Sequence, residues 1–257
     1  MKKIISFLIV ACTLGLASCK KDNAVENTPK TELEKYLDDN KGFTISDQLI
    51  ACAASQPSTE VDYAQYPISV FFLPIIGAFE FKYFECNDIN VSITDYAKFN
   101  EKALTSDPVF NGYLRRFKNS TIKQDVWGIV TYKVGNVIHI CRAIRIKHYT
   151  KPTQFAPELI TIKDSLTYPK FSWSDGVIPE NAIYFQVVSD AMNNLISGTY
   201  TYDKFFQFYQ LNNVVLNIRD VQPIPQLLAA TKYNFLLMAV SQDNWVNMVG
   251  EKSFTTQ

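Results

Sequence analysis

The chain has 257 residues, of which 47% are hydrophobic and 14% aromatic, and its 25 basic residues balance its 25 acidic ones. The apolar content is too high for an intrinsically disordered protein, and the length suffices for two domains with cores of their own. A net charge of zero provides no field that attracts a polyanion, so we expect no nucleic-acid partner.

The first 18 residues have the parts of an export signal. Lysines at positions 2 and 3 precede an apolar segment, 4–16, which has the length of a secretory signal and is too short to span a bilayer. This start resembles the lipobox of bacterial lipoproteins, with cleavage after Ser18. The resemblance implies a diacylglycerol and an N-acyl chain on the next residue and no other cofactor. The lipobox residues are Leu16, Ala17, Ser18 and Cys19.

Residues 19–42 are polar and charged, and we predict a tether there. Its composition favours a short helix over 31–40, which would be marginal by itself in water. The style of the sequence, Lys20-Lys21-Asp22 after the lipidated cysteine and then a polar stretch, is similar to envelope lipoproteins of the Bacteroidota. That resemblance implies anchoring in the outer membrane, with the body facing either the periplasm or the cell surface.

The pattern of residues 43–155 predicts a first β-sandwich-like domain of immunoglobulin-like type. Short runs rich in Val, Ile, Phe and Tyr predict strands over 67–73, 78–85 and 109–117. A hairpin is predicted over 126–134 and 137–147, because Gly135 tolerates the positive φ that the turn requires. Four isoleucines of its second strand share one face, which we expect to be buried. The segment 94–104 breaks the alternation and predicts a helical crossover.

Prolines between 150 and 158 mark the seam to a second domain, residues 156–257. Its strands are predicted over 169–173, 184–188, 234–240 and 251–255. The order resembles a fibronectin type III-like sandwich, with Trp173 in the core and Tyr233 following Leu227 and Thr231. The resemblance implies that the Tyr233 hydroxyl bonds to nearby backbone. Ala229 and Ala230 replace the usual Pro and Gly of that turn. The predicted fold class is therefore all-β, with two tandem sandwiches.

No catalytic or metal-binding motif stands out. The two histidines, His139 and His148, lie nine residues apart in one predicted strand and would point to opposite faces. The cysteines left after the signal, at positions 52, 86 and 141, lack Cys-x-x-Cys spacing. They read as small buried residues, although a bridge between Cys52 and Cys86 is possible. We expect no catalytic residue, no metal and no enzyme.

The candidate binding residues lie in two loops that the fibronectin resemblance brings to one end of the second domain. Trp245 is an aromatic anchor there if it is exposed, and folding back over the sandwich is the alternative. A run of six rings over 200–209 either fills the core or forms a stacking surface. The candidate residues are Asp175, Asp243, Asn244 and Trp245.

These features predict a lipid-anchored, non-enzymatic envelope protein that acts as a binding or scaffold module through its sandwich loops. Its expected partners are the membrane, through the lipid anchor, and an envelope protein or a glycan. The alternative is a carbohydrate-binding accessory lipoprotein in polysaccharide uptake, or less readily a glycoside hydrolase, which would need two carboxylates roughly 5 to 10 Å apart.

Overall fold

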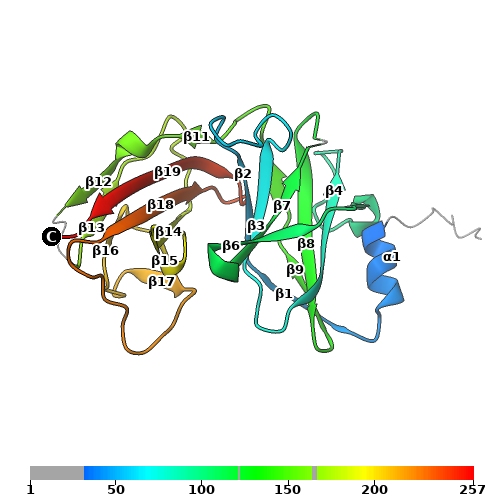
Figure 1. Ribbon diagram of the computed structural model, residues 1–257. Helices are drawn as coiled ribbons and strands as arrows, with labels where there is room; N and C mark the ends of the chain where they lie inside the picture. The colour runs from blue at the N-terminus through cyan, green and yellow to red at the C-terminus, as the bar shows by residue number, and fades with distance from the viewer. Residues whose placement is uncertain (1–31, 121, 164–166) are drawn as a thin grey trace, which may run out of the picture.

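The computed structural model describes residues 32–120, 122–163 and 167–257 (Figure 1), so the lipobox and Cys19 lie outside the described residues. Within these ranges the chain forms nineteen strands, one α-helix and three short 3-10 helices, and the expected predominance of β-structure is confirmed. No helix in the described part of the chain is both long and apolar enough to cross a membrane. We call 32–153 the N-terminal half and 154–257 the C-terminal half.

The N-terminal half consists of two sheets with a hydrophobic core between them. One sheet has the order β1-β9-β8-β4-β5, with β10 also paired to β8, and the other has the order β2-β3-β7-β6. Phe117 links the sheets, because it stacks on Phe72 of its own sheet at 5.4 Å between centroids and on Tyr83 of the other sheet at 5.7 Å. The strands are β1 (Thr44–Leu49), β2 (Ala51–Ser55), β3 (Ile68–Phe72), β4 (Phe79–Cys86), β5 (Asn100–Lys102), β6 (Ser106–Val109), β7 (Leu114–Asn119), β8 (Val126–Val134), β9 (Val137–Cys141) and β10 (Ile144–Ile146).

Helix α1 (Glu32–Asp39) confirms the short helix expected over 31–40, but it is packed against the body rather than free in a tether. Leu33 is fully buried and Tyr36 is 9% exposed in the N-terminal core, and the backbone of Leu33 donates to the carbonyl of Phe99 at 3.1 Å. The second part of the predicted tether is therefore a packed element, because its three large apolar side chains, Leu33, Tyr36 and Leu37, share one helical face. Figure 1 shows α1 at the end of the N-terminal half that faces away from the C-terminal half.

Two other predictions in this half are wrong. The expected helix over 94–104 is a single 3-10 turn, η1 (Tyr96–Lys98), followed by β5, because the edge of β4 is available for pairing and Phe99 is buried. The expected strand over 109–117 is interrupted by η2 (Phe110–Gly112). There Phe110, Asn111 and Gly112 all have positive φ, and the chain reverses from β6 into β7.

The predicted hairpin forms, and Gly135 has a φ of +54° at its turn. Two residues outside the ladder split the second strand into β9 and β10. Both β9 and β10 pair with β8. The predicted buried face is confirmed, since its four isoleucines are at most 2% exposed. These residues are Ile138, Ile140, Ile144 and Ile146.

The C-terminal half also has two sheets, with strand orders β11-β19-β18-β14-β15-β17 and β12-β13-β16. Phe171 stacks on Phe235 at 4.0 Å between centroids, and this pair joins the two sheets across a second core. The four predicted strands correspond to β13, β14, β18 and β19. The elements are β11 (Gln154–Phe155), η3 (Pro157–Leu159), β12 (Ile160–Lys163), β13 (Lys170–Trp173), β14 (Ile183–Asp190), β15 (Leu195–Thr201), β16 (Phe205–Gln207), β17 (Val214–Asn217), β18 (Lys232–Val240) and β19 (Val246–Thr255).

The turn before β18 has the expected contact. The Tyr233 hydroxyl accepts a hydrogen bond from the backbone N–H of Leu228 at 2.9 Å. Ala230 has a φ of +51°, in the left-handed region that glycine adopts without steric cost. The turn thus has the left-handed geometry that favours glycine, although its residue 230 is alanine.

A third hydrophobic cluster joins the halves. It combines Ala54 and Leu114 of the N-terminal half with Phe185, Met238 and Val246 of the C-terminal half. Sheet β2-β3-β7-β6 is therefore covered on both faces, by its own core and by the neighbouring half.

Candidate functional site

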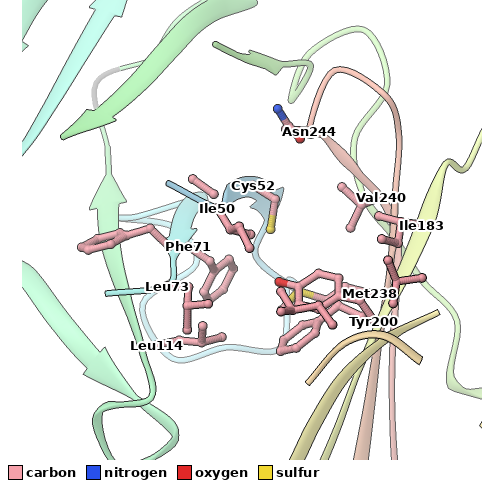
Figure 2. Close-up of a pocket in the computed structure, with 15 residues that line it drawn as sticks. Ile50, Cys52, Phe71, Leu73, Leu114, Ile183, Tyr200, Met238, Val240 and Asn244 are labelled. Carbon is pink, nitrogen blue, oxygen red and sulfur yellow. The ribbon is translucent and has the colours of Figure 1, made fainter. Parts of the chain in front are cut away.

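A cavity of about 310 Å³ lies between the halves, beside the shared cluster (Figure 2). Cys52, Phe71 and Leu73 form its wall on the N-terminal half. Ile183, Tyr200 and Met238 form the opposite wall. A ligand pocket typically has a volume of about 300–1,000 Å³ and is mostly apolar with few polar groups, so this cavity falls at the small end of that class.

Strand alternation explains how β2 and β3 serve two surfaces. In β2, Ala51 and Ala53 belong to the N-terminal core, whereas Cys52 points to the other face. In β3, Phe72 enters the same core and Phe71 lines the cavity. The sequence signal for such a strand is a nearly continuous apolar run rather than strict alternation, because both faces are covered.

Strand β18 shows the same signal from the C-terminal half. Its run 235–240 is apolar at every position. Phe235 and Leu237 enter the C-terminal core, while Met238 and Val240 line the cavity. Our sequence interpretation assigned this run to a sandwich core and missed the second surface.

The polar groups inside the cavity are neutral. Burial raises the pKa of the Cys52 thiol to about 12 and raises the pKa of Tyr200 well above its ordinary value. The Tyr200 ring stacks on Phe185 at 4.5 Å, and Figure 2 shows its hydroxyl directed toward the middle of the cavity. All three cysteines in the described part of the chain are free, so the possible Cys52–Cys86 bridge is not formed.

A polar pocket of about 230 Å³ adjoins the cavity and shares Ile50, Ala51 and Asn244 with it. Arg142 lines this pocket, is exposed, and has no ion pair with any described residue. Asp47 lies in the same pocket, where its carboxylate accepts a hydrogen bond from Gln48 Nε2 at 2.8 Å.

The interpretation of Trp245 as an exposed anchor is wrong. The side chain is fully buried within the core of the N-terminal half, although the loop that carries it belongs to the C-terminal half. Its indole N–H donates to the carbonyl of Lys151 at 2.8 Å. The carbonyl of Asn244 accepts from the backbone of Ala53 at 3.0 Å, and this bond joins the loop to β2.

The two predicted loops do meet, at a third pocket of about 520 Å³ lined by Asn181 and Asp243. Asp243 is ion-paired with Lys147 at 2.7 Å. Asp175 does not line that pocket, and instead accepts hydrogen bonds from Tyr184 at 2.6 Å, Asn181 at 2.9 Å and Lys204 at 2.5 Å.

Burial alone would raise the pKa of Asp175, but those three bonds outweigh it and hold the pKa below its usual value. Of the four candidate residues, only Asn244 lines the apolar cavity. Asp175 and Asp243 have their own partners and serve the loop structure.

The described residues show no catalytic arrangement around these pockets. His148 Nδ1 lies 2.8 Å from Ser55 Oγ, but that hydroxyl also accepts from the backbone of Thr153 and lines none of the pockets above. His139 stacks on Tyr132 at 5.0 Å. No group of three or more His, Cys, Asp or Glu in the described ranges could hold a metal ion.

No protein-family model matches this chain, and no curated protein matches it.

Proposed function

We propose that this chain is a lipid-anchored, non-enzymatic binding protein of a bacterial envelope, and that its ligand binds in the cavity between the halves. The observation that carries this proposal is the cavity itself, which is apolar and has walls from both halves. Its Cys52 thiol and Tyr200 hydroxyl are neutral, so the site is suited to binding rather than to acid–base or nucleophilic chemistry.

The proposal includes two β-sandwich domains, the second of them fibronectin type III-like. Each half has its own pair of sheets and its own core, which supports the division. The bond from Leu228 to the Tyr233 hydroxyl and the strand order β12-β13-β16 opposite β19-β18-β14-β15 support the fibronectin resemblance.

The lipid anchor is proposed from the lipobox at Cys19. Its acyl chains would insert into the outer membrane. Because α1 starts at the end of the body that faces away from the C-terminal half, a chain of some thirteen residues before it would leave the cavity clear of the headgroups. Metabolic labelling with a radioactive fatty acid should mark the wild-type protein and not Cys19→Ala. Protease shaving of intact cells then distinguishes the periplasmic from the surface orientation.

Carbohydrate binding keeps little of its support, since Tyr202, at 67% exposure, is the one strongly exposed ring of the run 200–209. Trp245 is buried, and Phe206 and Phe208 of the aromatic run are core residues at most 2% exposed. We therefore propose no second function.

Native mass spectrometry of the protein extracted from membranes tests the binding function. Val215 lines the cavity on β17 and is 48% exposed, so Val215→Trp fills the mouth with little cost to the core. Val61→Trp is the matched control, at a fully exposed position outside the pockets described above. A bound mass retained by the control and lost from Val215→Trp supports the proposal. If both variants carry the same bound ligand and the same partner, the proposal is refuted.

A further inference from the structure

The cavity and the polar pocket lie directly beside each other. Ile50, Ala51 and Asn244 line both, so the two voids are separated by no more than these shared residues. Figure 2 shows Asn244 set apart from the cluster of rings, on the side of Ile50 and Cys52. One region is thus apolar and the other, next to it, is polar and open.

We infer that the two regions form one site for a single-chain amphiphile with a carboxylate head, the apolar chain lying in the cavity and the head beside Arg142. This inference rests on the proposed function, since it names the ligand class of the same cavity. The molecule is small and unbranched, which separates it from a two-chain phospholipid or a folded protein segment.

Volume and lining identify the tail. The cavity of about 310 Å³ has twice the volume of an engineered apolar cavity of ~150 Å³ that binds benzene, so it accommodates about a dozen carbon atoms. Phe71, Leu73 and Met238 offer no hydrogen bond to a polar chain, and Cys52, Tyr200 and Asn244 are the only described lining side chains with a polar hydrogen. An alkyl chain needs none, and each methylene transferred from water should strengthen binding about fourfold.

Charge identifies the head. Arg142 is the cation of the polar pocket, and its guanidinium is without an ion pair among the described residues. A guanidinium presents parallel N–H donors that match a carboxylate. Asp47 opposes a carboxylate head, since the hydrogen bond from the neutral Gln48 amide leaves its charge in place, so the choice of a carboxylate rests on the paired donors of Arg142. The Asn244 amide at the junction offers a further donor to the head.

Calorimetric titration of the chain 20–257, which retains every described residue, with decanoate, decan-1-ol and decylamine tests the inference. Decanoate should bind most tightly, and octanoate about fifteenfold more weakly than decanoate because it lacks two methylenes. Arg142→Gln should weaken decanoate binding up to about fivefold and leave decan-1-ol unchanged, whereas Asp47→Asn should strengthen decanoate binding. Lys123→Gln, at an exposed position away from the pockets, should change neither.

Each result opposite to these expectations overturns one defined part of the inference. Equal binding of the three head groups, unaffected by Arg142→Gln, overturns the carboxylate assignment. Decanoate binding that survives Val215→Trp overturns its location. If no amphiphile binds while the membrane-extracted protein still holds a mass that Val215→Trp removes, the ligand class is wrong and the proposed function stands.

Discussion

Replacing Trp245 with alanine tests whether the C-terminal half is built into the core of the N-terminal half. The indole is fully buried among N-terminal side chains, and removal of a buried Trp or Phe typically costs about 3–5 kcal/mol. The Lys151 carbonyl also loses its donor, which adds about 1 kcal/mol. We therefore expect a loss of roughly 4–6 kcal/mol, a large share of the ~5–15 kcal/mol that stabilises a typical domain.

Differential scanning calorimetry should show this loss as a fall in Tm of roughly 10–20 °C, since each kcal/mol corresponds to about 2–4 °C in a domain of this size. Trp173→Ala is the matched control. Trp173 is 7% exposed and packs within the C-terminal core alone. Both variants lose a buried indole, but only Trp245→Ala removes the ring that fixes the loop against β2.

Native-state hydrogen exchange distinguishes the two variants. The amide of Ala53 donates to the Asn244 carbonyl, so its protection should fall more in Trp245→Ala than in Trp173→Ala. A Tm change below about 3 °C in Trp245→Ala, or unchanged protection at Ala53, would refute the coupling of the halves through this ring.

Three further outcomes are expected. Ala230→Gly should raise the free energy of unfolding by up to about 1 kcal/mol, because glycine adopts the left-handed conformation of this position without strain, although it also makes the unfolded chain more flexible. Urea denaturation measures this change, and a decrease would contradict a strained alanine in the turn. Tyr233→Phe should lower that free energy by about 1 kcal/mol, since the Leu228 amide loses its acceptor, and an unchanged urea midpoint would exclude a contribution from this bond. Burial raises the pKa of Cys52 and Cys141 to about 12 from 9.0. The folded state therefore has its full stability below pH 9 and loses stability as the pH rises toward 12. The free energy of unfolding should fall by at most about 1.4 kcal/mol per pH unit for each thiol. Urea midpoints at pH 8.5 to 10.5 should fall less steeply in Cys52→Ala, and equal slopes would show that this thiol ionises normally.

Local pattern was sufficient to predict much of the strand content. The hairpin at Gly135, the strand that ends at Trp173 and the strand predicted over 234–240 follow from alternation, turn residues and a motif, all of which act over a few neighbouring residues. The helix expected over 94–104 failed because the open edge of β4 provided pairing that a local reading does not include.

The site was less accessible to sequence reasoning. Asn244 was predicted from its place in a loop, but the cavity it lines requires the other half to be in position. Trp245 has a polar context in sequence, with amides and an acid before it, and nothing local indicates that the core receiving it is nearly a hundred residues away, around Lys151. The apolar runs in β3 and β18 were the available signal, since a strand that is apolar at consecutive positions must be covered on both faces.

The buried ring and the cavity are parts of one arrangement. Asn244 lines the cavity and its neighbour Trp245 is held in the N-terminal core, so the packing of this ring helps to fix where Asn244 lies. A ligand between two independently moving halves would have to order them on binding, and this cost would be subtracted from its affinity. Here the Trp245 ring, the Asn244–Ala53 bond and the shared cluster order the halves in advance. Weaker binding of decanoate by Trp245→Phe, with the cavity lining itself unchanged, would therefore measure how much of the affinity depends on that order.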